Sequence, residues 1–124
     1  MQLHPIMYVP DQYAERAFYA LFGFTTRYEA DEFPGFLALE HGDAVIGLQR
    51  ESDGNPPYQE GLRWQFEVET TEQIDSIVAV CRANALEHEV ISERGGRRFV
   101  TRIVKVRSPS GYLVWFEGPN ESSD

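Results

Sequence analysis

The strongest constraint on the fold is that one order of predicted elements occurs twice along the chain. A short apolar run at 3–9 predicts a strand, and apolar residues at helical spacing then predict an amphipathic helix over 11–22. Asp11 offers an N-cap to this helix, and Gly23 suits the position just after it. Three further strands are predicted at 24–31, 36–40 and 43–50.

The same order restarts after the segment 51–61, which is rich in turn-forming and acidic residues and is predicted to be a linker. Residues 62–69 alternate between apolar and polar, as in a half-buried strand. Thr70 and Gln73 form a plausible capping box for a second amphipathic helix over 71–84. Three more strands are predicted at 87–92, 98–106 and 111–117, and the acidic tail 118–124 is expected to fray.

The predicted order is therefore βαβββ, a linker and βαβββ, with a period of about 60 residues. A four-stranded sheet that carries one helix leaves its other face uncovered. Two such sheets can curve around a shared cleft with the helices outside, which is an α+β architecture. We expect one domain over 1–124, with modules 1–50 and 62–118 joined by 51–61.

Composition narrows the function classes. The formal net charge of −9 argues against nonspecific nucleic-acid binding, which needs a basic surface. It is compatible with attraction of cationic small molecules and equally with a charge that only keeps the protein in solution. With a single cysteine, no visible signal peptide and no long apolar run, we expect a cytoplasmic protein without membrane or nucleic-acid partners.

Three segments resemble the vicinal oxygen chelate superfamily, which includes glyoxalases, bleomycin resistance proteins and dioxygenases. The segment HPIMYVPDQYAERAFYALFGF resembles its first strand and helix, and WQFEVETTEQIDSIVAVCRANA resembles the opening of its second module. RSPSGYLVWFEGP resembles its closing D-P-x-G-x-x-x-x-F-x-E strand, with Ser108 and Ser110 where acids are common. Within the superfamily, the chain is most similar to the bleomycin-resistance-like binding members.

The resemblance implies a metal site with one ligand from each of four strands, and the chain departs from that pattern. The four positions fall on His4, Gly47, Arg63 and Trp115, and only the first of these is a ligand type. The sequence thus predicts no metal and no cofactor. A displaced site remains an alternative, because Gln49, Glu67 and Glu117 lie two residues further along the same strand faces.

Period-2 alternation predicts which side chains line the cleft. The set mixes aromatic and hydrogen-bonding groups, as ligand pockets do. The predicted ligand-binding residues are His4, Tyr8, Phe33, Phe36, Gly47, Gln49, Arg63, Gln65, Glu67, Trp115 and Glu117. Two alternatives stay open: Trp115 fills the space a metal would occupy, and Arg63 forms a surface ion pair with Glu67.

The leading hypothesis is a non-catalytic protein that sequesters an aromatic or cationic small molecule, with antibiotic or toxin resistance as the expectation from the family. The first alternative is a metal-dependent lyase, isomerase or dioxygenase that uses the displaced ligands. The second is an interaction domain whose cleft is closed. The resemblance also implies a homodimer, in which 51–61 could serve as the hinge for an exchange of modules.

Overall fold

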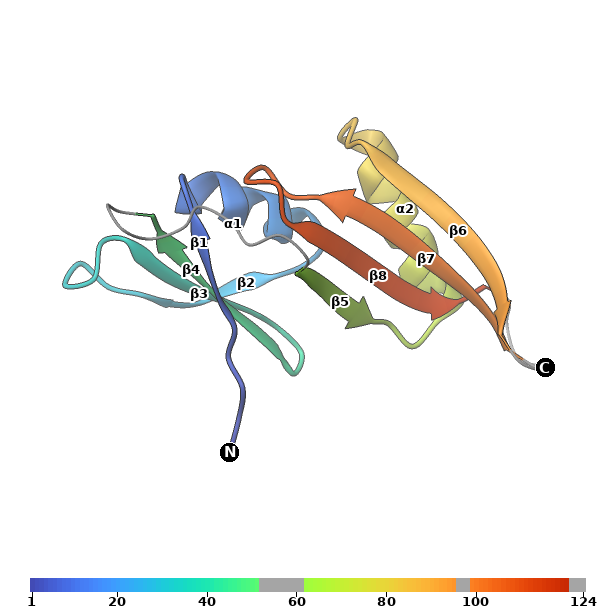
Figure 1. Cartoon of the computed structure of the whole chain (residues 1–124), viewed down its shortest axis with the longest axis horizontal. Helices are drawn as coiled ribbons and strands as arrows, with labels where there is room; N and C mark the ends of the chain where they lie inside the picture. The colour runs from blue at the N-terminus through green and yellow to red at the C-terminus, as the bar shows by residue number, and fades with distance from the viewer. Residues whose placement is uncertain (52–61, 96–98, 121–124) are drawn as a thin grey trace. The chain divides into compact units, whose positions relative to one another are not determined.

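The structure, a computed structural model, describes residues 1–51, 62–95 and 99–120. It confirms the α+β class and the repeated order of elements (Figure 1). The elements are β1 (Ile6–Val9), α1 (Gln12–Leu21), β2 (Thr25–Glu29), β3 (Phe36–His41), β4 (Ala44–Arg50), β5 (Arg63–Glu67), α2 (Thr71–Ala83), β6 (His88–Gly95), β7 (Phe99–Arg107) and β8 (Leu113–Pro119). The chain divides into two compact units: Met1–Gly61 with Ser108–Gly111, and Leu62–Arg107 with Tyr112–Asp124.

The sheet of the first unit has the strand order β1-β4-β3-β2. β1 pairs with β4 in parallel, and the other pairs are antiparallel. Helix α1 packs on one face, where the hydroxyl of Tyr19 reaches the sulfur of Met7 at 3.7 Å. That face is uniformly apolar and buried; it carries Met7, Val9, Leu37, Leu39, Ile46 and Leu48. Each such side chain contributes about 1.5–3 kcal/mol through burial, so this face holds the unit together.

The sheet of the second unit repeats the plan with the order β5-β8-β7-β6. Only β5 and β8 pair in parallel. Helix α2 covers one face, against which Val104, Val106, Val114 and Phe116 are buried. Cys81 of α2 is also fully buried, and burial raises the pKa of its thiol. As expected from its place on the apolar stripe, Cys81 is a small core residue rather than a reactive thiolate.

Both helices begin as the sequence predicts. The Asp11 carboxylate accepts hydrogen bonds from the backbone N–H groups of Tyr13 and Ala14. Thr70 and Gln73 form the complete capping box. Gly23 follows α1 with a φ of 96°, a left-handed conformation that favours glycine.

Several element boundaries differ from the predicted ones by two or three residues. β1 begins at Ile6 rather than at residue 3, because its pairing with β4 starts at Ile6. Pro5 and the exposed Leu3 lie before the paired residues. β8 continues to Pro119, so the first residues of the predicted tail belong to a strand, and Gly118 packs against Val68 and Ile74. β6 likewise runs on to Gly95, three residues beyond its predicted end.

Some expectations lie outside the described residues, namely those for most of the linker, at 52–61, and for the last four residues of the tail. In the part of the chain that the structure describes, neither helix combines the length and the apolar character that a membrane crossing requires.

A buried carboxylate holds the segment Ser108–Gly111 within the first unit. Glu15 of α1 is fully buried, and its Oε1 accepts the backbone N–H of Ser110 at 2.6 Å. Its Oε2 has no hydrogen-bond partner among the described residues. Burial raises the pKa of the Glu15 carboxyl, with a further small rise from Asp11, although the neighbouring hydroxyls of Ser110 and Ser108 oppose it.

Candidate ligand-binding site

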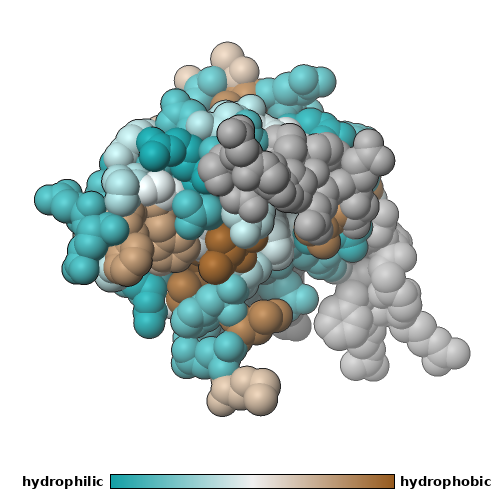
Figure 2. All heavy atoms as spheres, turned by 60° about the vertical axis from the view of Figure 1, so that its left-hand side comes forward, coloured by the Kyte–Doolittle hydropathy of each residue, from teal (hydrophilic) through white to brown (hydrophobic). Residues whose placement is uncertain are grey.

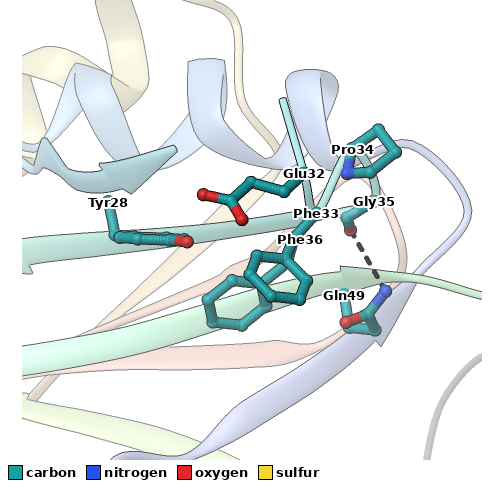
Figure 3. Close-up of a pocket in the computed structure, with 7 residues that line it drawn as sticks. All are labelled: Tyr28, Glu32, Phe33, Pro34, Gly35, Phe36 and Gln49. Carbon is teal, nitrogen blue, oxygen red and sulfur yellow. Dashed lines mark hydrogen bonds between the residues drawn. The ribbon is translucent and has the colours of Figure 1, made fainter. Parts of the chain in front are cut away.

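An open pocket of about 610 Å³ lies in the first unit, where the β2–β3 connection meets the face of the sheet that α1 leaves uncovered. We call this the aromatic pocket; its lining residues are Tyr28, Glu32, Phe33, Pro34, Gly35, Phe36 and Gln49 (Figure 3). Its volume lies within the range of small-molecule sites.

The aromatic walls follow from strand register. Phe36 pairs with Gln49 across β3 and β4, so both side chains project from the same face. A register shift between Thr26 and Tyr28 turns Tyr28 toward Phe36, and their ring centroids are 6.0 Å apart. Phe33 adds a third ring that is 56% exposed, which is unusual for a side chain of this size.

One carboxylate belongs to this aromatic surface. In Figure 3 the Glu32 side chain points into the space between Tyr28 and the neighbouring rings of Phe33 and Phe36. Within the described part of the chain, no hydrogen bond or ion pair engages the Glu32 carboxylate. Aromatic faces and a carboxylate both attract positive charge, so the pocket favours a cation.

Hydrogen bonds from α1 and β4 hold the loop that carries these residues. The buried Gln12 of α1 donates from Nε2 to the Pro34 carbonyl at 3.0 Å. The Gly35 carbonyl accepts the backbone N–H of Arg50 at 2.7 Å and the Gln49 amide at 3.3 Å (Figure 3). A loop held by these bonds needs little further ordering when a ligand binds.

Gly47 has a structural reason to lack a side chain. A Cβ at this position would lie 3.0 Å from Cγ1 of Ile6 and 3.1 Å from Cε2 of Phe36. The absence of a side chain lets the Phe36 ring lie against β4, next to the aromatic pocket. The second family metal position is thus taken up by apolar contacts.

In the second unit, Trp115 of β8 is covered by two cations. The Arg63 guanidinium carbon lies 3.8 Å from the indole centroid, and the Lys105 ammonium nitrogen lies 4.2 Å from it. Both are within the range of cation–π contacts. The alternative of an Arg63–Glu67 pair is absent from the ion pairs of the described residues, because the guanidinium lies on the indole instead.

The polar residues of this face are arranged in register. Gln65 lies beside Trp115, and Glu67 lies beside Glu117, across β5 and β8. The Gln65 amide donates a short hydrogen bond to the Glu117 carboxylate. The Glu117 carboxylate therefore already accepts a hydrogen bond from a residue of its own unit.

The residues at the family metal positions do not fit a metal ion. Gly47 has no donor atom, Arg63 is a permanent cation and Trp115 offers only an N–H. His4 is exposed and precedes β1. No group of three or more His, Cys, Asp or Glu side chains in the described ranges gathers closely enough to bind a metal. Two candidate ligands of the displaced site make hydrogen bonds within their own units: the Gln49 amide donates to the Gly35 carbonyl, and the Glu117 carboxylate accepts from Gln65.

Each unit positions its own share of the residues predicted from sequence. Phe33, Phe36 and Gln49 meet in the aromatic pocket, with Gly47 beside them. Tyr8 projects from the same sheet face, opposite Gln49 in register, and does not line the pocket. Arg63, Gln65, Glu67, Trp115 and Glu117 share the helix-free face of the second sheet.

Five residues were missed. Tyr28, Glu32, Pro34 and Gly35 line the pocket, and Lys105 lies on Trp115. Alternation along the predicted strand 98–106 could have identified Lys105. Tyr28 could not have been found in this way, because the register shift changes its phase relative to β3.

Comparisons with known proteins agree with this architecture. A sequence model of the Glyoxalase/Bleomycin resistance protein/Dioxygenase superfamily matches residues 2–116. A search of curated proteins found no match.

Solved structures share the fold at low sequence identity. A glyoxalase/bleomycin resistance protein/dioxygenase from Alicyclobacillus acidocaldarius is 10% identical, with a TM-score of 0.74 over 98% of this chain and 92% of that chain. A lactoylglutathione lyase from Agrobacterium tumefaciens is 16% identical, with a TM-score of 0.69 over 95% and 92%. A glyoxalase/dioxygenase from Nostoc punctiforme is 18% identical, with a TM-score of 0.70 over 95% and 90%.

Proposed function

The chain belongs to the Glyoxalase/Bleomycin resistance protein/Dioxygenase superfamily, and we propose that it is a non-catalytic binding protein that captures an aromatic, cationic small molecule in the aromatic pocket. The observation that carries this proposal is the arrangement of Tyr28, Phe33 and Phe36 around the carboxylate of Glu32.

The physical argument rests on the complementarity of this pocket to a flat cation. A cation over an aromatic face gains about 0.5–2 kcal/mol, more as the contact is desolvated. The ring system of the ligand adds apolar burial at roughly 25 cal/mol per Å². The Glu32 carboxylate supplies the opposite charge, and the net charge of −9 raises the local concentration of cations.

The residues around Trp115 in the second unit also favour the aromatic pocket as the site for a cation. The sequence-based hypothesis used Trp115 as the stacking surface for a cation. Arg63 and Lys105 already lie on that indole and would repel a cationic ligand. A ligand of this charge is better accommodated in the first unit.

The test compares two probes of the same shape. We expect 1-naphthylmethylammonium to bind at least about tenfold more tightly than the neutral 1-naphthalenemethanol, a difference of about 1.4 kcal/mol. Glu32→Gln should remove most of that difference and leave alcohol binding unchanged. Binding is measured by isothermal titration calorimetry at low and at physiological salt, since added salt weakens the preference for the cation.

The matched control is Asp31→Asn, which removes the neighbouring exposed carboxylate outside the pocket lining. It should leave the preference for the cation nearly intact. Equal affinity for the two probes, or equal losses from the two substitutions, would contradict the proposed ligand class. Stoichiometric, tight binding of a divalent metal would favour the alternative of a metal-dependent lyase, isomerase or dioxygenase.

We also propose that the protein forms a homodimer, as the resemblance implies. Apolar side chains at the surface support an interface of this kind. Ile6 of the edge strand β1 is 53% exposed and Leu3 before it is 89% exposed. Figure 2 shows hydrophobic side chains reaching the surface among hydrophilic ones.

A further inference from the structure

The geometry points to a second binding site, in the other unit and of opposite charge preference: Arg63, Lys105 and Trp115 form an anion site that takes a small carboxylate. The three residues come from β5, β7 and β8 and share the face of the sheet that α2 leaves uncovered. We call this group the indole–cation site. It is independent of the function proposed for the aromatic pocket.

Strand register brings the two cations together. Lys105 lies directly opposite Trp115 across β7 and β8, and Arg63 lies beside Leu113, two residues before the partner of Trp115 on β5. Side chains at such direct and diagonal positions reach one another. Both cationic groups therefore contact one indole.

No described acid forms an ion pair with either cation. Arg63 and Lys105 are absent from the ion pairs and hydrogen bonds formed among the described residues. Glu89 is the register partner of Lys105 on β6, and it makes no ion pair with Lys105 within the described part of the chain. Glu117, the nearest acid on β8, accepts from Gln65. Two cations that form no ion pair with a described residue thus lie on one ring, in a chain whose net charge is −9.

The way Arg63 lies on the ring leaves its donors available. The Arg63 guanidinium carbon lies 3.8 Å from the indole centroid, and a guanidinium that stacks on an aromatic face keeps its N–H donors available at its edge. A carboxylate binds such an edge through two parallel hydrogen bonds. An anion placed there also reduces the repulsion between the two cations.

The site also sets a limit on the ligand. Because Arg63 and Lys105 cover the indole, the two cations recognise the carboxylate of the ligand. The indole of Trp115 supports the two cations. Glu117, two residues beyond Trp115 on β8, and its register partner Glu67, four residues beyond Arg63 on β5, disfavour a second negative charge in that direction. The expected ligand class is therefore a small monocarboxylate.

The experiment titrates the intact protein with benzoate and with benzamide, a neutral molecule of nearly the same shape. Binding is followed by the indole N–H resonance of Trp115 in ¹H–¹⁵N spectra, assigned with Trp64→Phe. We expect a saturable shift with benzoate and at least about tenfold weaker binding of benzamide.

Substitutions then separate specific binding from general charge. Arg63→Gln and Lys105→Gln should each weaken benzoate binding about tenfold, and Arg63→Lys should recover only part of the loss because lysine cannot bind in the bidentate manner. Arg82→Gln, which removes an exposed cation of α2 away from the indole, should leave the affinity unchanged.

Equal shifts with benzoate and benzamide would overturn the indole–cation site, as would equal losses from Arg82→Gln and Arg63→Gln. A melting curve for each variant checks that it is folded. Glu32→Gln should not weaken benzoate binding, so this result and the test of the aromatic pocket can fail independently.

Discussion

Glu15 shows at the scale of one residue how burial changes the chemistry of a side chain. Its carboxylate lies in the core of the first unit, where one oxygen accepts the N–H of Ser110 and the other has no partner among the described residues. A charged carboxylate in such a place is costly, and the raised pKa of Glu15 reflects that cost.

The raised pKa has a direct consequence for stability. The folded chain keeps the proton on Glu15 at pH values where the unfolded chain, with a pKa near 4.5, has released it. Stability from this group is therefore fully present below pH 4.5 and is lost as the pH rises through the raised pKa of the folded state.

Glu15→Gln tests this prediction, because the amide can still accept from Ser110 and carries no charge. We expect the variant to be close to the natural protein in unfolding free energy near pH 4. At pH 8 it should be the more stable of the two. Urea unfolding at both pH values measures the difference between the proteins, so contributions from other carboxylates cancel. If the natural protein were more stable than Glu15→Gln at pH 8, this account would be contradicted.

Gln12 is a single residue whose side chain connects the helix α1 to a loop of the sheet. It sits in the first turn of α1, yet its side chain bonds the loop between β2 and β3. Helix α1 thereby helps to position Phe33 and Pro34 in the aromatic pocket.

Gln12→Ala should therefore affect both stability and binding. Loss of a buried hydrogen-bonding side chain costs about 1–3 kcal/mol of unfolding free energy. We also expect several-fold weaker binding of 1-naphthylmethylammonium, because the loop must then be ordered when the ligand binds. Chemical denaturation and calorimetry measure the two effects.

A second variant separates these effects. Gln73→Ala breaks the capping box of α2, in the other unit, and should cost about 1 kcal/mol. It should leave binding in the aromatic pocket unchanged. If both variants weakened binding equally, general destabilisation rather than loop anchoring would be the cause.

The elements themselves were largely predictable from local sequence signals. The caps at Asp11 and Thr70 mark where the helices begin, and the left-handed Gly23 marks the end of α1. Alternation along β8 correctly placed Val114 and Phe116 in the core and Trp115 on the other face. The first strand was predicted too long because Leu3 is apolar, although it lies outside the pairing with β4 and is exposed.

At the scale of the whole molecule, the repeated order of elements gives two units with the same topology and different surfaces. The helix-free face of the first sheet carries aromatic rings beside an acid. The corresponding face of the second carries an indole beneath two cations. Topology alone therefore does not determine what each unit binds.

The homodimer is tested at this same scale. Sedimentation equilibrium should give twice the chain mass of 14.2 kDa at micromolar concentration. Ile6→Lys, which places a charge on the exposed edge strand, should shift the equilibrium toward the monomer. A natural protein that is monomeric over this range would contradict the homodimer.

The sequence by itself determined the order of elements, the core faces and the loss of ligand types at Gly47, Arg63 and Trp115, because each follows from local periodicity or from side-chain chemistry. Only the tertiary structure decided what those residues contact. The shift in register turns Tyr28 toward Phe36, and Lys105 joins Arg63 on the indole. Such contacts depend on pairing between strands that are distant in sequence, and local patterns do not encode this pairing.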